Sequence, residues 1–332
     1  MMNRRHCLGA TLGAIGAGAA AGLSPLTALA ANGAWPNRPI RMVVPFPAGG
    51  STDMVARHLA QGLGERLGVP IVVDNRAGAA GNIGTDAVAK SSADGYTIGL
   101  VTSGPLVNNK FLYKSMSFDA DKDLAPIALV CEIPTVIVSN PNQSKLRNLK
   151  DLIDMARANP SSVSVATPGN GTIGHLSLAA LSMTSGVKLQ DVPYRGDTPA
   201  LTDLLGGVVQ AISAPVSAFI PNIQAGKMRA LAVTSQARFP GLPDVPTAKE
   251  QGIDLTATVW LAVVGPAGMP APAVQLLNAE INRVLESAQG KSKLQQYGAV
   301  VATGKPELLR QRIQADAQKW QQVIQSAQIK LD

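Results

Sequence analysis

The sequence predicts an α/β protein of two domains, and three observations support this prediction. Short apolar runs, typical of buried strands, alternate with segments whose apolar residues recur at every third or fourth position, as on one face of a helix. The length of 332 residues suits two domains of ordinary size. The 32 glycines and 23 prolines indicate many turns rather than a helical bundle. Alternating strands and helices predict parallel sheets whose ligand-binding loops lie at the carboxyl ends of the strands.

The first thirty residues are predicted to be an export signal and not part of the fold. Arg4 and Arg5 form a twin-arginine pair, residues 8–23 are mildly apolar, and Ala28-Leu29-Ala30 has the form of a signal-peptidase site. The mature chain then begins near Ala31. The paired arginines favour twin-arginine export over the Sec route, although the sequence does not decide between the two. We expect the protein to be periplasmic.

Composition argues against nucleic-acid-binding, membrane-spanning and metal-dependent proteins. The formal net charge is +7, but the lysines and arginines are scattered, with no basic run of five or more. After the signal, no stretch approaches the roughly 20 apolar residues of a membrane span. Histidine and cysteine show no metal-ligand spacing, so we expect no metal or other cofactor. Cys131 lies in an apolar run, which predicts an inert core residue.

The elements follow in order from the apolar pattern. The predicted strands are Ile40–Val44, Ile71–Val73, Tyr96–Val101, Val163–Ala166, Gln210–Ser213, Met228–Thr234 and Thr258–Val264, with a further strand end at Val192–Gly196. The predicted helices carry the apolar faces Val55-Leu59-Leu63-Leu67, Ala87–Ala89, Lys150–Ala158, Leu176–Met183, Pro272–Leu285 and Pro306–Ile324.

Two extended segments are predicted to cross between the domains. Residues 125–138 are interpreted as two extended segments broken at Pro134, and residues 258–264 as the return crossing. We therefore expect one domain of residues 31–132 plus 253–332 and a second domain of residues 133–252.

The turn after the first strand has the composition of a main-chain anion site. Ala48, Gly49 and Gly50 let bare backbone approach a ligand, and the following helix directs free N–H groups toward it. No lysine follows as in a phosphate-binding Walker loop, so a carboxylate fits better than a phosphate. Ser51 or Thr52 is the expected N-cap. Asp53 in the first turn either complements the helix dipole or contacts the ligand.

A second loop of the same kind follows a second predicted strand. Residues 167–172, Thr-Pro-Gly-Asn-Gly-Thr, precede another amphipathic helix. Two such loops facing one another across a cleft would hold one carboxylate from both sides. Arg195 ends a nearby strand and could pair with a second carboxylate, or it could be an ordinary surface arginine.

An exported hydrolase is the main alternative from another class. Its nucleophile would be Ser51 or Ser103 and its base His175. The sequence contains no Gly-x-Ser-x-Gly motif, and a histidine near a helix start is expected to be packed or hydrogen-bonded. A third interpretation is a surface interaction protein with an empty cleft. We expect a binding protein and no enzyme.

From Trp35 to the carboxyl end, the chain resembles the substrate-binding proteins of tripartite tricarboxylate transporters, also called Bug proteins. The motifs that carry this resemblance are Pro45–Gly50 with Asp53 and Ala56-Arg57, Asn75–Gly78, Asp94–Thr97, Thr167–Thr172 with His175-Leu176, Val192–Tyr194, Pro199-Ala200, Asp203–Gly207, Leu242–Thr247, Trp260, Trp320, Val323-Ile324 and Lys330–Asp332.

The resemblance implies a two-domain periplasmic-binding-protein fold, type II-like, whose cleft lies between domains joined by crossing strands. It also implies that the domains close on a carboxylate and deliver it to membrane permease subunits, with a sensory role as an alternative. We expect a monomer that binds no nucleic acid. Together with the loop analysis, it gives a ligand-binding set of Phe46, Ala48, Gly49, Gly50, Ser51, Asp53, Ser103, Pro168, Gly169, Asn170, Gly171, Thr172, Tyr194, Arg195, Ser213 and Ala214.

The chain departs from the family pattern at the far end of the expected cleft. Ser213-Ala214-Pro215 stands where members of the family often carry Phe-Asp, and Arg195 stands where lysine is common. Without that acid, an amino-acid ligand is disfavoured, because its ammonium group would need a partner. The resemblance therefore favours a di- or tricarboxylate or an aromatic acid.

Overall fold

The computed structural model describes residues 35–160 and 163–331. The predicted export signal, residues 1–30, lies outside the described residues. From Pro36 onward the chain belongs to one compact unit. The predicted division of this unit at residues 132 and 252 remains a prediction.

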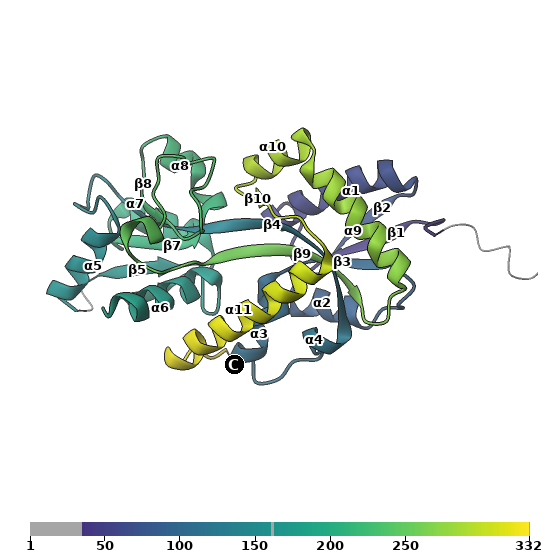
Figure 1. Cartoon of the computed structure of the whole chain (residues 1–332). Coiled ribbons are helices and arrows are strands. Elements are labelled where there is room, and N and C mark those ends of the chain that lie inside the picture. The colour runs from purple at the N-terminus through teal and green to yellow at the C-terminus, as the bar shows by residue number, and fades with distance from the viewer. Residues whose placement is uncertain (1–34, 161–162, 332) are drawn as a thin grey trace, which may run out of the picture. The chain divides into compact units, whose positions relative to one another are not determined.

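The strands form a mixed sheet in the order β2-β1-β3-β9-β4-β7-β5-β6, with β8 and β10 also paired to β4 (Figure 1). Parallel pairing joins β1 to β2 and β3, and joins β5 to β6 and β7, whereas every pairing of β4 and β9 is antiparallel. The strands are β1 (Ile40–Val44), β2 (Ile71–Asn75), β3 (Thr97–Thr102), β4 (Leu124–Ser139), β5 (Ser164–Thr167), β6 (Gln190–Pro193), β7 (Ala211–Pro215), β8 (Arg229–Val233), β9 (Thr258–Pro266) and β10 (Val300–Val301).

Strand β4 is one continuous strand of 16 residues and takes part in both segments of the sheet. Its residues from Leu124 to Pro134 pair with β9, and those from Thr135 to Ser139 pair with β7. The predicted break at Pro134 is therefore wrong. Proline is tolerated because it lies at the change of partner, where the missing N–H removes little from either ladder.

The helices are connected to the strands by short loops. They are α1 (Ser51–Leu67), α2 (Asn82–Ala89), α3 (Asn109–Leu112), α4 (Ala120–Asp123), α5 (Leu149–Ala158), α6 (Ile173–Ser185), α7 (Asp197–Gly206), α8 (Ile220–Gln224), α9 (Ala271–Glu286), α10 (Ala288–Gln296) and α11 (Pro306–Ser326), with short turns η1 (Ala79–Gly81), η2 (Gly104–Asn108), η3 (Val216–Ala218) and η4 (Lys249–Gln251). In the part of the chain described, no helix is both long and apolar enough to cross a membrane.

Most predicted elements are confirmed within a few residues. The apolar repeat from Val55 to Leu67 forms α1, and the predicted first strand coincides with β1. The pattern did not predict α7 or α10, whose polar or glycine-containing sequences leave few residues buried. Tertiary contacts, rather than an apolar stripe, decide such short helices.

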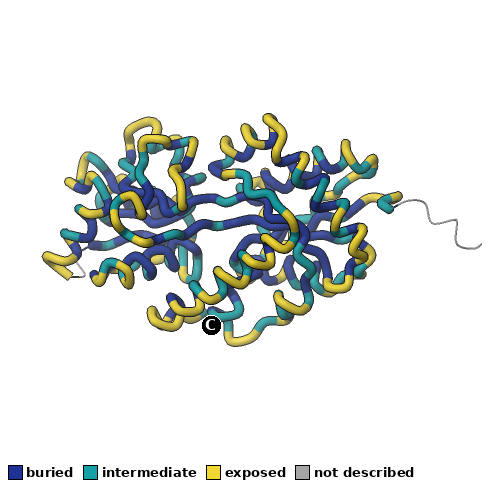
Figure 2. The backbone as a smooth tube through the Cα atoms, viewed as in Figure 1, coloured by how far each residue is buried: buried dark blue, intermediate teal, exposed yellow. Residues whose placement is uncertain are grey.

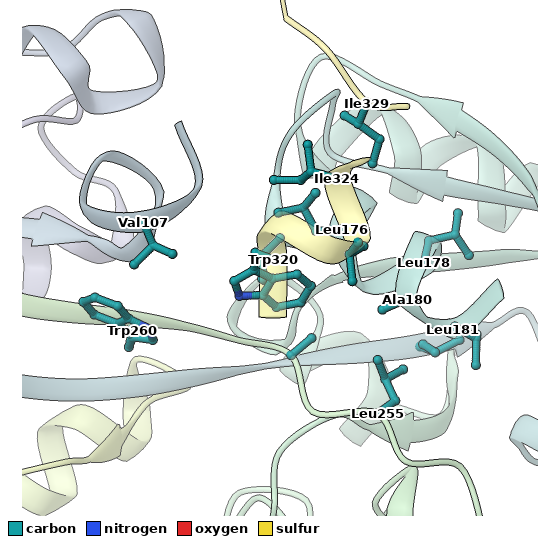
Figure 3. Close-up of a cluster of buried hydrophobic side chains, with 14 of the residues drawn as sticks. Val107, Leu176, Leu178, Ala180, Leu181, Leu255, Trp260, Trp320, Ile324 and Ile329 are labelled. Carbon is teal, nitrogen blue, oxygen red and sulfur yellow. The ribbon is translucent and has the colours of Figure 1, made fainter. Parts of the chain in front are cut away.

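The core follows strands β4 and β9, the two strands predicted to cross between domains, which are buried along most of their length (Figure 2). Trp260 of β9 is fully buried, and Trp320 of α11 packs in the same cluster with Leu176 of α6 (Figure 3). Cys131 is also fully buried, and this burial raises its thiol pKa to about 12, which confirms an inert core residue. Helix α11 thus connects the crossing strands to α6, the helix that follows the second glycine-rich loop.

The buried carboxyl-terminal part of β4 should be sensitive to loss of side-chain volume. Replacing the fully buried Ile137 by alanine is expected to lower the free energy of unfolding by about 2–5 kcal/mol, because it removes buried methylene groups and leaves a cavity. Val208→Ala, at a side chain 64% exposed, should change it by less than about 0.5 kcal/mol. Urea unfolding measures both, and equal effects would contradict this assignment of the core.

Candidate functional site

The first glycine-rich loop joins β1 to α1 and exposes its main chain. Gly49 has φ 83°, a conformation open mainly to glycine, and residues 47–50 are exposed. Helix α1 begins at Ser51 with Gly50 as N-cap and no side-chain cap, so the expectation of Ser51 or Thr52 as N-cap is wrong. The first-turn N–H groups have no acceptor within the helix and remain available to an anion.

A polar network around the buried Asp53 holds this loop in place. Asp53 is 2% exposed, and its carboxylate accepts hydrogen bonds from Gly49 N–H at 2.9 Å, Arg57 Nε at 2.9 Å and Asn75 Nδ2 at 3.0 Å. Asn75 also donates to the Phe46 carbonyl at 3.0 Å. Burial raises the pKa of Asp53, but these hydrogen bonds outweigh burial and lower it overall. The network gives Asp53 a supporting role in the loop.

Asn75 is a supporting residue that the sequence analysis did not assign to the site. It lies at the end of β2, the strand paired with β1, so its side chain reaches the loop only through the register of the sheet. The adjacent turn η1 packs on the same loop: a Cβ at Gly81 would lie 3.3 Å from Phe46 Cζ and 2.9 Å from Pro105 Cγ. Ser103 is buried, with 3% of its surface exposed, and immediately precedes η2, the segment that contains Pro105.

The second glycine-rich loop joins β5 to α6 and is held by its own side chains. Thr172 is the N-cap of α6, and its hydroxyl accepts from His175 N–H at 3.4 Å and donates to the Gly169 carbonyl at 2.7 Å. Gly171 N–H donates to His175 Nδ1 at 3.1 Å. Asn170 is exposed. As at α1, the first-turn amides of α6 have no acceptor within the helix.

His175 is engaged by the loop and by Asp191. Its Nδ1 accepts the Gly171 N–H, and its Nε2 lies 3.6 Å from the Asp191 carboxylate. Burial lowers the pKa of His175, while the negative charge of Asp191 partly opposes this shift. Both ring nitrogens therefore face groups other than a serine hydroxyl. This geometry gives the pairing of His175 with Ser51 or Ser103 no support.

The remaining predicted residues gather around the second loop. Gly196 N–H donates to the Pro168 carbonyl at 2.9 Å, which brings the Tyr194-Arg195 turn beside residues 168–172. Tyr194 donates its hydroxyl to Asp203 at 2.6 Å, and burial together with Asp203 raises its pKa to about 12. Arg195 is exposed.

Ser213 and Ala214 form a buried strand end under the second loop. Ser213 is fully buried and donates its hydroxyl to the Gly174 carbonyl at 3.0 Å. The Gly174 backbone lies so close to β7 that a Cβ there would overlap the Ser213 carbonyl oxygen. This contact fixes the start of α6 against the sheet.

Asp197 is an acidic residue near the second loop that the sequence analysis did not consider. It is the first residue of α7, and its Oδ1 is buried with no hydrogen-bond partner among residues 35–160 and 163–331. Burial raises its pKa. The Gly-Asp-Thr-Pro run at 196–199 is a helix-start pattern, so this position could have been found from the sequence.

The second loop also contacts the segment that follows Ser103. A Cβ at Gly171 would lie 3.1 Å from Leu112 of α3 and 2.7 Å from Leu331. Leu331 N–H donates to the Leu112 carbonyl at 2.8 Å. In the described ranges no hydrogen bond joins residues 46–53 directly to residues 168–172. The two loops are thus not joined by a direct hydrogen bond.

The comparisons with known proteins agree with this architecture. The family described as the tripartite tricarboxylate transporter family receptor matches residues 55–329. The chain belongs to this family. Protein BugT of Bordetella pertussis is 41% identical to this family member over 299 residues, covering 90% of this chain and 91% of BugT.

Two solved structures share the fold of this receptor-family chain. Rpa4515 of R. palustris, solved with adipate, has a TM-score of 0.78 and 35% identity, covering 89% of this chain and 99% of that one. MatC from Rhodopseudomonas palustris, solved with bound malate, has a TM-score of 0.73 and 30% identity. The match covers 87% of this chain and 100% of MatC. The predicted family and the α/β periplasmic-binding-protein fold are confirmed.

The close approach of α6 to β7 should make Gly174 intolerant of a side chain. Gly174→Ala is expected to destabilise the fold by about 1–3 kcal/mol, because the new methyl group overpacks against the Ser213 carbonyl. Gly206→Ala is the matched control: its Cβ would have no neighbour nearer than 4.0 Å, and alanine favours helix. Urea unfolding should separate the two variants, and similar stabilities would refute the close contact.

His175 should make stability depend on pH. Its folded pKa is lowered relative to the unfolded value of about 6.5, so the unfolded state binds more protons and unfolding becomes easier as pH falls below that value. The stability lost by the wild type between pH 8 and pH 5 should exceed that lost by His175→Gln. His58, whose pKa burial also lowers, is present in both proteins and cancels in the difference. If the stability of the wild type and of His175→Gln changed equally with pH, the lowered pKa of folded His175 would be contradicted.

Proposed function

We propose that this chain is a periplasmic receptor that binds a small organic carboxylate. The observation that carries the proposal is a pair of glycine-rich loops, 46–50 and 168–172, each following a parallel strand and leading into the amino end of a helix. Each loop presents main-chain N–H groups, and each is held by a polar side chain, the buried Asp53 or the partly buried His175. Such preorganised donors suit a carboxylate.

The relatives support the same ligand class. The family is described as a receptor of tripartite tricarboxylate transporters, and the two similar structures were solved with adipate and malate, both dicarboxylates. We propose a dicarboxylate as the preferred ligand, with tricarboxylates and aromatic acids as neighbouring candidates. Exposed Arg195, beside the second loop, is proposed to pair with the second carboxylate.

We further propose that binding closes the predicted domains, 31–132 plus 253–332 and 133–252, about the crossing strands. Strand β4 changes partner at Pro134, close to the predicted boundary, which makes this point a natural hinge. The closed monomer would then deliver its ligand to the membrane permease subunits of the transporter. Export of the chain and cleavage near Ala30 would place it in the periplasm.

A thermal-shift screen of the chain from Ala31 tests the proposal. Mono-, di- and tricarboxylic, aromatic and amino acids are compared, with adipate and malate among them. A ligand at 100 times its Kd should add about 2.7 kcal/mol to the stability of the folded state, which gives a clear rise in melting temperature. A response confined to one class of acid supports the proposal, and no response to any acid overturns it.

Arg195 should distinguish dicarboxylates from monocarboxylates. Arg195→Gln is expected to weaken dicarboxylate binding about tenfold or more, the loss typical of one charge-assisted hydrogen bond, and to leave monocarboxylate binding nearly unchanged. Arg147→Gln is the matched control. It removes an exposed arginine that belongs to neither glycine-rich loop, and it should change neither dicarboxylate nor monocarboxylate binding. Isothermal titration measures all three proteins. Equal affinity of the wild type and Arg195→Gln for a dicarboxylate would remove Arg195 from the site.

A further inference from the structure

A cavity lies against strands β4 and β9 and is lined by none of the residues of the proposed carboxylate site. Its volume is about 680 Å³, within the range of small-molecule sites. Its walls come from β4, β9, β10, α11 and the loop that follows β8. Pro134 and Thr258, the pair at which β4 changes partner, both line it.

The body of this hinge cavity, as we name it, is largely apolar. Val300, Val301 and Pro240, which are exposed or half-buried, supply its accessible aliphatic surface. Trp320 and Phe239 lie behind this surface and are only 2% and 0% exposed. Ala315 of α11 is an exposed lining residue with little volume of its own. These residues could pack against a flat or branched hydrocarbon group.

Most charged groups of the hinge cavity already have partners. Arg312 is paired with Glu132, donates to Asp316 at 2.9 Å and donates to Thr258 at 3.0 Å. Asp316 also accepts from the Trp260 indole at 2.6 Å. These groups anchor α11 to both crossing strands, so they are not free to hold a ligand without loss of structure.

Lys319 differs from the other charged groups of the cavity. An ammonium group carries three donors, and in the described chain that of Lys319 has one hydrogen-bond acceptor, the Thr256 carbonyl. Its Nζ also lies 4.8 Å from the centre of the Trp320 ring. Burial lowers the pKa of Lys319, and the negative charges of Asp316 and Asp254 partly oppose this shift. Among the described residues neither carboxylate is hydrogen-bonded to its Nζ. The cavity thus combines an apolar body with one incompletely satisfied cation.

We propose that the hinge cavity is a second ligand site, for an amphipathic organic monoanion. The acid group of the ligand would pair with the Lys319 ammonium, and its apolar body would pack on Val300, Val301 and Pro240. The cavity borders the point at which β4 changes partner, so an occupant would contact this point and the loop that follows β8. This site is additional to the proposed carboxylate site and does not depend on it.

Fluorescence titration with 8-anilinonaphthalene-1-sulfonate, an aromatic monoanion, tests this proposal. Lys319→Met removes the cation, and Ala315→Phe fills the cavity from an exposed position of α11. Lys227→Met, at an exposed lysine outside the cavity, and Gln318→Phe, at an exposed α11 residue that does not line it, are the matched controls. Circular dichroism checks that each variant is folded.

We expect the dye to bind the wild type at one saturable site, and both cavity variants to weaken this binding about tenfold or more. The two controls should bind as the wild type does. If Lys319→Met does not fold, Ala315→Phe decides the result alone. Binding that is absent, not saturable or unchanged by Ala315→Phe would overturn the proposal. The carboxylate screen is read separately, so either proposal can fail while the other stands.

Discussion

The antiparallel ladder between β4 and β9 is the constraint on which the rest of the structure depends. Both strands are buried, and β4 pairs with β9 up to Pro134 and with β7 beyond it. One uninterrupted strand thus fixes both parallel segments of the sheet. The glycine-rich loops follow strands of these segments, so their positions are set by the ladder rather than by contacts between the loops.

Each loop exposes main-chain donors and is held from below by side chains. Asp53 and Asn75 fix the first loop, and His175 with Thr172 fixes the second. These polar side chains order the backbone of the loops, and the proposed ligand would bind the amides at the helix starts. Binding by ordered amides reduces the entropy lost on association, which is the physical advantage of such preorganisation.

Helix α11 connects strands β4 and β9 to the second glycine-rich loop. Arg312 and Asp316 anchor it to β4 and β9, and Trp320 packs with Leu176 of α6. Beyond the helix, Leu331 lies against Gly171 and Leu112. The carboxyl-terminal segment therefore supports the second loop, and α11 also forms one wall of the hinge cavity.

The sequence by itself determined the fold class, most strands and helices, both glycine-rich loops and the family. These features are local, because they depend on residues close together in the sequence. Examples are an apolar repeat of two or about four residues and a glycine run between a strand and a helix. Only the tertiary structure decided that β4 continues through Pro134, that Asn75 reaches the Phe46 carbonyl, and that Gly50 rather than Ser51 is the N-cap of α1. It also decided where Lys319 and Asp197 lie. These features depend on strand register and on packing between residues far apart in the chain, which no local pattern encodes.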